Sequence, residues 1–265
     1  MTTTAVAPLA ITVEDHVATL TLNRPETLNA FDEEMHTAFD RAVDELHHLD
    51  GVRAAVLAST GKVFSAGGDF GVFTRCHADP VAAQRIADEG QHLLTQLIAL
   101  PYPIISAVQG AAIGLGATVS LACDMIVAAR SAKFGDPHVL VGLVAGDGGC
   151  LVWPQSAGMA RAKRFLLTGD TLPAEDAYQF GLVTDLVDTP DEVLPAAQAL
   201  ARKIAALPPV AVQGTKRALA TVMAQRAAEV VSLGFSYETR TFATEDILEA
   251  VAAAKERRPG VYQGR

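Results

Sequence analysis

The sequence predicts an α/β fold that ends in a purely helical segment, and two observations carry this prediction. Short apolar runs at 54–57 and 104–108 alternate with amphipathic helical patterns up to about residue 187. This order is typical of strand–helix–strand units around a largely parallel sheet. From there on the chain shows only helical patterns, and we therefore expect a core over residues 1–190 and a helical segment over 191–265, with helices at 192–206, 209–225, 227–238 and 240–256.

The individual elements of the core have clear local signals. Residues 9–13 and 16–22 are β-rich and alternate apolar and polar side chains on either side of an acidic pair, which predicts a β-hairpin. Asp32 stands directly before a helical pattern and is the expected N-cap. A further helix is expected over 81–100, where two prolines end it. The glycine- and serine-rich residues 59–70 are expected to form a loop.

Composition limits the classes of function. The chain has 265 residues, half of them hydrophobic, which is enough for one large core. A net charge of −9 without a cluster of basic residues argues against nucleic acid or an anionic membrane as a partner. Three cysteines without a CxxC pair argue against a disulfide framework or a zinc site. The N-terminus lacks the features of a signal peptide and no run reaches the ~20 apolar residues of a membrane span, so we expect a cytoplasmic protein.

The stretch over residues 110–149 is the part of the chain most typical of an active site. Glycines alternate with apolar runs, and a short helix is expected over 117–121. His138 and Asp147 are isolated polar residues among Val, Leu and Gly. Burial in such surroundings can tune a pKa, and sites of chemistry are often built in this way. We therefore take both residues as candidates for catalysis.

Six motifs, spread over nearly the whole chain, occur in a recognisable order. They are TLNRPETLNAF (21–31), AAVLASTGKVFSAGGDF (54–70), PIISAVQGAAIGLGATVSLACDMIVAA (103–129), FGDPHVLVGLVAGDGG (134–149), AKRFLLTGDTLPAEDAYQFGLVTDLV (162–187) and FATEDILEAVAAAKERR (242–258). Together they resemble the crotonase (enoyl-CoA hydratase/isomerase) superfamily. The resemblance implies a ββα spiral core with a C-terminal helical segment, and assembly into trimers or dimers of trimers. It also implies an acyl-CoA substrate and a backbone oxyanion hole. Apolar faces on the C-terminal helices independently favour a homo-oligomer.

The resemblance assigns the oxyanion hole to two backbone N–H groups. They belong to Ala66, before the glycine of the AGGD-like turn, and to Leu115, in the middle of the later GxG. Gly67, Gly68 and Gly114 would let the backbone approach the thioester closely. Such donors stabilise an enolate or a tetrahedral oxyanion, and removing one typically costs about 3 kcal/mol of transition-state stabilisation.

Binding of coenzyme A is less sharply indicated. By resemblance, Thr27, Leu28 and the 66–69 turn with Asp69 line the path of the adenine and the pantetheine. Arg24, together with Lys62 and the basic residues of 255–258, is a candidate for the phosphates, although for each residue taken singly a solvated surface charge is the better interpretation. Glu26 stands where many hydratases carry a lysine. We expect no cofactor other than coenzyme A as part of the substrate, and no metal.

The two catalytic glutamates of the hydratases are missing. Placed on this chain, their positions are Thr118 and His138. Two carboxylates that together activate one water are therefore absent, and hydration by that mechanism is not expected. The hydroxyl of Thr118 could hold a water or a carbonyl group, or simply pack.

His138 and Asp147 offer a replacement. A neutral imidazole is a competent general base near pH 7, and a neighbouring carboxylate would fix its tautomer or carry a second proton. The pattern PH…GDG…VWP also occurs in the β-diketone hydrolase branch of the superfamily, where a His–Asp pair activates water for retro-Claisen cleavage of a C–C bond. An additional histidine of that branch is replaced here by Leu115. The alternative readings are a core histidine and an aspartate of a turn or helix cap.

Three functions follow for the chain as a whole. The first is a lyase or isomerase of the enoyl-CoA hydratase/isomerase type that uses the oxyanion hole with His138 and Asp147. The second is a C–C hydrolase of a β-diketone or β-keto compound. The third is a CoA-binding homologue without catalysis.

Glu238 and Glu245 in the C-terminal segment are expected to be solvated.

Overall fold

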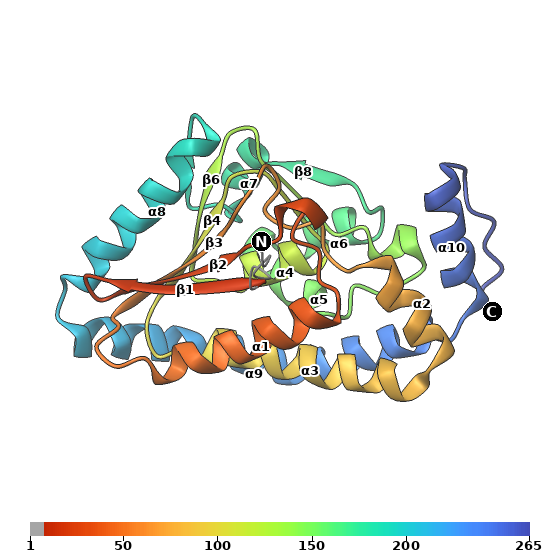
Figure 1. Cartoon of the computed structure of the whole chain (residues 1–265), viewed down its shortest axis with the longest axis horizontal. Coiled ribbons are helices and arrows are strands. Elements are labelled where there is room, and N and C mark those ends of the chain that lie inside the picture. Colours follow the sequence, from red (N-terminus) through yellow and green to blue (C-terminus); the bar gives the residue numbers. More distant parts are fainter. Residues whose placement is uncertain (1–7) are drawn as a thin grey trace, which may run out of the picture.

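A six-stranded sheet lies at the centre of the fold in the computed structural model, which describes residues 8–265 (Figure 1). The order of its strands is β1-β2-β3-β4-β6-β9. The first pair is antiparallel and every later pair is parallel. The strands are β1 (Leu9–Glu14), β2 (Val17–Leu22), β3 (Ala54–Ser59), β4 (Ile104–Val108), β6 (Met125–Ala129) and β9 (Asp185–Val187). The predicted hairpin and the largely parallel sheet are thus confirmed.

A second, three-stranded sheet consists of β5 (Ala111–Ile113), β7 (Lys133–Gly135) and β8 (Thr171–Pro173). β5 and β7 are parallel, and β8 runs antiparallel to β7. An isolated bridge pairs Ser65 with Ala112 of β5. The small sheet therefore connects the 65–67 turn with the beginning of the glycine-rich stretch.

Long helices cover the large sheet. α8 (Pro190–Ala205) packs against β3, β4 and β6. α1 (Glu33–His48), α3 (Pro80–Ala99) and α9 (Pro209–Phe242) run along the lower edge of Figure 1, where α3 contacts both of the others. Asp32 caps α1 as expected, since its side chain accepts a hydrogen bond from the N–H of Met35. The remaining helices are η1 (Pro25–Thr27), α2 (Phe70–Ala78), α4 (Leu115–Leu121), η2 (His138–Val141), α5 (Gly149–Ala157), α6 (Met159–Leu166), α7 (Ala174–Phe180) and α10 (Glu245–Glu256).

The prediction of separate helices at 209–225 and 227–238 is wrong. Both belong to α9, which has 34 residues and continues to Phe242. The residues around position 226 are Ala, Gln and Arg, which favour helix, and no proline or glycine interrupts them. One helix therefore runs without a break from Pro209 to Phe242.

Helix α2 was not predicted, and α4 begins earlier than predicted. The side chain of Asp69 accepts from the N–H of Gly71 and caps α2, which has nine residues. A helix of this length offers few apolar positions from which a period can be recognised. α4 starts at Leu115, with Gly114 as its N-cap, so Leu115 lies in its first turn.

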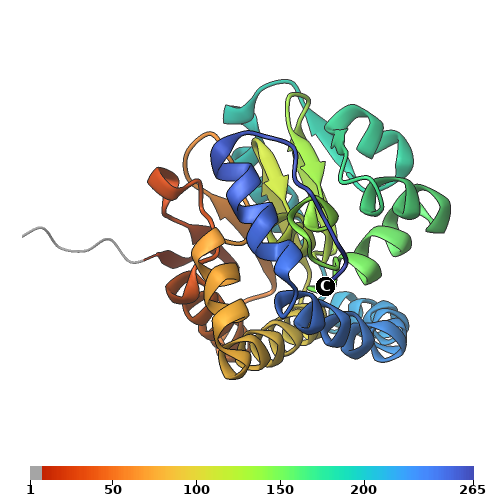
Figure 2. The same cartoon turned by 90° about the vertical axis from the view of Figure 1, so that its right-hand side faces the viewer.

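A small hydrophobic cluster lies beside the main core. It is formed by residues of α2, α3, the loop after η2, the end of α9 and α10, and includes Val72, Phe73, Phe242 and Ile247. α10 packs on α2 and η2, and closes this side of the molecule (Figure 2). The α/β class with a C-terminal helical region is confirmed. The division of the chain at residue 190 stays a prediction. Helix α8, which begins there, packs on the sheet of the core.

Two expectations about location have different outcomes. Within residues 8–265, no helix is both long and apolar enough to cross a membrane. The expectation about a signal peptide falls largely on residues 1–7, which lie outside the described part of the chain.

Candidate active site

The two turns that carry the predicted oxyanion donors lie side by side. The N–H of Ser65 donates to the carbonyl of Ala111 at 3.1 Å, and the N–H of Ile113 donates to the carbonyl of Ser65 at 3.0 Å. A Cβ on Gly67, whose φ is +84°, would lie 2.6 Å from the carbonyl oxygen of Ile113, so only glycine allows this approach. Ala66 and Leu115 therefore come from adjoining segments.

The two donors differ in their present hydrogen bonding. Leu115 is the first residue of α4, where backbone N–H groups have no partner inside the helix, and no side chain caps this end. The N–H of Ala66 donates to the carbonyl of Leu28 at 3.0 Å. Leu28 and Asn29 have φ values of +56° and +52°, an uncommon conformation for residues other than glycine. An oxyanion at this place would have to share or displace the Leu28 carbonyl.

The predicted CoA-binding residues are placed as follows. Arg24 forms an ion pair with Asp32 at 2.6 Å and lies 3.6 Å from Glu34, so its charge is already partnered. The hydrogen bonds that Arg24 donates to Asp32 raise the pKa of Arg24 despite partial burial. Thr27 and Leu28 are exposed in and just after η1. Asp69, also exposed, is the N-cap of α2, which gives it a structural role beside the turn.

Two adjoining cavities meet at His138. The outer cavity, about 290 Å³, is lined among others by Ala66, the three predicted glycines and Pro137. The inner cavity, about 50 Å³, is lined by Leu115, Asp147 and Glu238, together with His36, Val72, Ile86, Phe235 and Phe242. His138, Gly68 and Phe73 line both. A thioester held in the outer cavity would thus place its acyl group next to His138.

The ring of His138 has carboxyl groups at both of its nitrogens. Nδ1 makes a short hydrogen bond with Oδ1 of Asp136. Nε2 lies 3.6 Å from Oδ2 of Asp147 and 3.9 Å from Oε1 of Glu238. Burial lowers the pKa of His138, but the nearby Asp136 and Asp147 carboxylates outweigh it and raise this pKa well above its ordinary value. The imidazole and the three carboxyl groups therefore form one buried cluster.

Asp147 is held by one of its two carboxylate oxygens. Oδ1 accepts from the hydroxyl of Thr118 at 3.2 Å and from the N–H of Gly149 at 3.2 Å. Oδ2 has no hydrogen-bond partner within residues 8–265. Burial raises the pKa of Asp147, and the charge of His138 limits the rise. Thr118 is thus placed to position Asp147, and the free oxygen of Asp147 faces His138.

Glu238 was predicted to be solvated, and this prediction is wrong. The residue is 8% exposed, and its side chain lines the inner cavity. Burial, together with the charges of Asp147 and Asp136, raises the pKa of Glu238 to about 8, although His138 opposes this. At neutral pH the carboxyl group is therefore mostly protonated.

The burial of Glu238 follows from the close approach of α9 to the 146–149 turn. A Cβ on Gly146 would lie 2.3 Å from the carbonyl oxygen of Gly234 and 2.7 Å from Cβ of Glu238. Only glycine at position 146 leaves room for the helix. The sequence did contain a signal, since Glu238 falls on the same helical stripe as Val231, Phe235 and Phe242.

Asp136 and His36 were also not recognised from the sequence. Asp136 is fully buried two residues before His138, and its Oδ2 has no partner within the described chain. His36 lies on α1 and lines the inner cavity. Burial lowers the pKa of His36 to about 4, so this imidazole is neutral at neutral pH.

Donor atoms of the kind that bind metals also gather here. Asp136, His138 and Asp147 each offer one ligand atom, and these atoms lie within 4.8 Å of one another. Asp40, Asp44 and His92 form a second such group at the surface.

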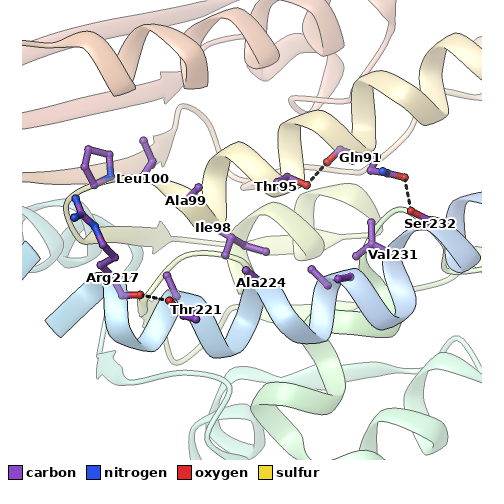
Figure 3. Close-up of a pocket in the computed structure, with 14 residues that line it drawn as sticks. Gln91, Thr95, Ile98, Ala99, Leu100, Arg217, Thr221, Ala224, Val231 and Ser232 are labelled. Atoms are coloured by element: carbon purple, nitrogen blue, oxygen red, sulfur yellow. Dashed lines mark hydrogen bonds between the residues drawn. The ribbon is translucent and has the colours of Figure 1, made fainter. Parts of the chain in front are cut away.

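A separate cavity of about 440 Å³ lies between α3 and α9 (Figure 3). Ile98, Ala224 and Val231 contribute to its wall, and a hydrogen bond of 3.2 Å joins Ser232 to Gln91 at one end. Among residues 8–265, Arg217 is the one titratable side chain that lines it. The cavity therefore offers no pair of groups for proton transfer, in contrast to the site around His138.

Comparison with known proteins gives a consistent result. A model of the enoyl-CoA hydratase/isomerase family matches residues 12–265. The chain belongs to this family. It is 35% identical over 256 residues to a 1,2-epoxyphenylacetyl-CoA isomerase of Escherichia coli, covering 96% of this chain and 97% of that protein. It is 37% identical over 215 residues to an (E)-benzylidenesuccinyl-CoA hydratase of Thauera aromatica, covering 80% and 81%.

The structure gives the same assignment. A crystal structure of an enoyl-CoA hydratase/isomerase from Mycobacterium paratuberculosis superposes with a TM-score of 0.89 and 34% identity, covering 93% of this chain and 98% of that one. The crotonase-type fold inferred from the motifs is therefore confirmed. As a member of the enoyl-CoA hydratase/isomerase family, the protein is an enzyme that acts on CoA thioesters.

The titration of Glu238 leads to a prediction about stability. A folded-state pKa of about 8 exceeds the ordinary value of 4.5, so the native state holds a proton that the unfolded state releases. The contribution of Glu238 to stability is full below about pH 4.5 and is lost as pH rises through 8, by at most about 1.4 kcal/mol per pH unit.

We expect Glu238→Gln to gain stability relative to the wild type over this window, measured by urea unfolding at several pH values. Glu229→Gln, an exposed change on the same helix, is the control. A constant difference between Glu238→Gln and wild type would contradict the assignment.

Proposed function

We propose that the enzyme binds an acyl-CoA with the thioester oxygen at the N–H groups of Ala66 and Leu115, and that His138 and Asp147 carry out general acid–base catalysis on the acyl group. The position of His138 supports this most directly. It lies where the cavity beside Ala66 joins the cavity that holds Leu115 and Asp147. An oxyanion hole and an acid–base pair next to one acyl group are what chemistry through an enolate requires.

The proposed reaction is hydration or isomerisation of an enoyl-CoA. The relatives named as an isomerase and a hydratase of CoA esters support it. The geometry supports it as well, because Nε2 of His138 and Oδ2 of Asp147 are 3.6 Å apart. This separation is too long for a direct hydrogen bond and suits two groups that hold one water or one substrate hydrogen between them.

A second candidate is hydrolytic cleavage of a C–C bond in a β-keto or β-diketone compound. The observation that favours it is the acid-rich inner cavity, where Glu238 joins His138 and Asp147. Water activated by such a cluster could attack a ketone as well as an alkene. Leu115, which replaces the additional histidine of the β-diketone hydrolases, makes this the second choice.

A non-catalytic CoA-binding protein is a poorer match to the site. Three carboxyl groups are buried around one imidazole, and three of their oxygens have no partner within residues 8–265. Burying such groups is costly in free energy. Binding of coenzyme A alone would not require them.

The inner cavity also bears on the choice of substrate. Its volume of about 50 Å³ holds only a few atoms, and Phe73, Phe235 and Phe242 limit it. We propose that acyl groups with a short tail beyond the reacting carbons are preferred. We further propose that no cofactor or metal is needed besides the coenzyme A of the substrate, and that the enzyme works in the cytoplasm.

Variants of the acid–base pair test the proposal. We expect His138→Ala and Asp147→Asn to lower kcat by about 10²- to 10⁴-fold, the usual contribution of general acid–base catalysis. The assay is hydration of crotonyl-CoA, followed by loss of enoyl absorbance, together with a panel of β-keto and 3-enoyl thioesters. Asp176→Asn, an exposed change on α7, should be unaffected, and EDTA should not inhibit. Tight binding of coenzyme A without turnover on the whole panel would instead favour the non-catalytic alternative.

We also propose a homo-oligomer, a trimer or a dimer of trimers. The first half of α9 and the turn before it expose large apolar side chains, among them Leu207, Val210, Leu219 and Val222. Leu207 and Leu219 border an apolar cavity of about 710 Å³. A second copy of the chain would remove this surface from water.

Light scattering during size-exclusion chromatography measures the assembly. We expect a molar mass of three or six times the chain mass of 27.8 kDa. Leu219→Glu should shift the protein toward smaller species, because it would bury a charge. A wild-type monomer at micromolar concentration would contradict the proposed assembly.

A further inference from the structure

The ring of His138 is flanked by acceptors at both nitrogens. A carboxylate can only accept hydrogen bonds, whereas a neutral imidazole has one N–H donor and one bare nitrogen. Asp136 occupies Nδ1, and the carboxyl group of Asp147 faces Nε2 at 3.6 Å. With a neutral ring, one nitrogen would present its lone pair to a carboxylate. With both nitrogens protonated, the Nδ1–H donates to Asp136 and the Nε2–H points toward the carboxyl group of Asp147.

We propose that Asp136 is a positioning residue that holds His138 as an imidazolium, so that His138 gives a proton to the acyl group and Asp147 takes one from the attacking water. This inference rests on the proposed function and assigns the direction of its proton transfers. It reverses the simplest expectation from the sequence, in which His138 is the base and Asp147 its orienting partner.

The side chain of Asp136 lies in closely packed surroundings. The side chain is fully buried directly after β7, and Oδ1 also lies 3.4 Å from the backbone nitrogen of His138. A Cβ on Gly149 would lie 2.3 Å from Oδ2, so the glycine leaves just enough room for the carboxyl group. The carboxylate is thereby packed between the ring of His138 and the start of α5.

The comparison with His36 separates burial from the effect of the carboxylates. Both imidazoles are buried, and both line the inner cavity. Burial dominates at His36, whose ring makes no hydrogen bond to a carboxylate of residues 8–265, and lowers its pKa to about 4. At His138 the carboxylates of Asp136 and Asp147 outweigh burial and raise the pKa.

The charges of the cluster also balance best in this state. The titratable groups that face His138 are Asp136 before η2, Asp147 after it, and Glu238 on α9. A protonated ring places a cation between the carboxyl groups at its two nitrogens. A neutral ring would leave the two carboxylates without a cation in a buried site, which is costly.

The proton transfers balance in hydration. Water loses a proton to Asp147 while its oxygen forms a bond to Cβ of the enoyl group. The π electrons move to Cα and the thioester oxygen, where the N–H groups of Ala66 and Leu115 stabilise the charge. His138 then delivers the Nε2 proton to Cα. Afterwards the proton on Asp147 returns to Nε2 by way of the next water that contacts both groups, which restores the starting state.

The protonation state of His138 can be measured directly in the wild type. The chain has seven histidines, so NMR of protein labelled with ¹⁵N at histidine can resolve the rings. The two nitrogens of an imidazolium have similar shifts, whereas those of a neutral ring differ widely. At pH 7 we expect the imidazolium pattern for His138 and the neutral pattern for His36, each assigned by its glutamine variant. A neutral pattern for His138 would overturn the inference.

Asp136→Asn tests the role of the carboxylate through the pH profile of kcat. The amide should lower the pKa of His138, so that activity falls about 10²-fold at pH 8 and much less at pH 6, where the ring is protonated again. KM should change by no more than a few-fold. An equal loss at both pH values would indicate a structural role and overturn the inference. Should this variant fail to fold, the spectrum of the wild type decides.

Failure of this inference can be told apart from failure of the proposed function. If His138→Ala is inactive but Asp136→Asn keeps the wild-type pH profile, His138 still catalyses and only the role of Asp136 is wrong. If His138→Ala retains full activity, the proposed function itself is wrong.

Discussion

Three buried carboxyl groups share one imidazole in this protein, and this interaction constrains everything around it. Asp136 touches one nitrogen of His138, while Asp147 and Glu238 face the other. Without the cation, the carboxyl groups would repel one another in surroundings that solvate charge poorly. Without the carboxyl groups, burial would keep the ring neutral, as it does at His36. The protonation states of the site are therefore properties of the cluster.

The fold brings these groups together through close backbone contacts. Asp136 and His138 follow β7, Asp147 lies in the turn before α5, and Glu238 comes from the distant helix α9. Gly146 allows α9 to approach that turn, and Gly67 allows the 65–67 turn to approach the end of β5. A side chain at either glycine would separate parts that the proposed mechanism needs in contact. The small sheet thus joins the 65–67 turn to the segment that leads into Asp136 and His138.

Much of this arrangement could be predicted from the sequence, and the exceptions have physical reasons. The motifs indicated the fold, and the spacing of His138 and Asp147 indicated a pair that the structure does bring together. Glu238 was missed because a glutamate on an alanine-rich helix is usually solvated, and its burial depends on where α9 lies in space. Asp136 was missed because a residue two positions away is not normally in contact with the ring, and here the turn into η2 folds it back. The hydrogen bond from Ala66 to Leu28 could not be foreseen, since it depends on a turn with two left-handed residues.

A crystal structure with a bound, unreactive acyl-CoA analogue tests the central claim most directly. The account predicts that the thioester oxygen lies about 3 Å from the backbone nitrogens of both Ala66 and Leu115, with the Leu28 carbonyl displaced or shared. It also predicts that the α- and β-carbons lie next to Nε2 of His138 and Oδ2 of Asp147. A thioester held elsewhere, or an acyl group that does not reach His138, would contradict it.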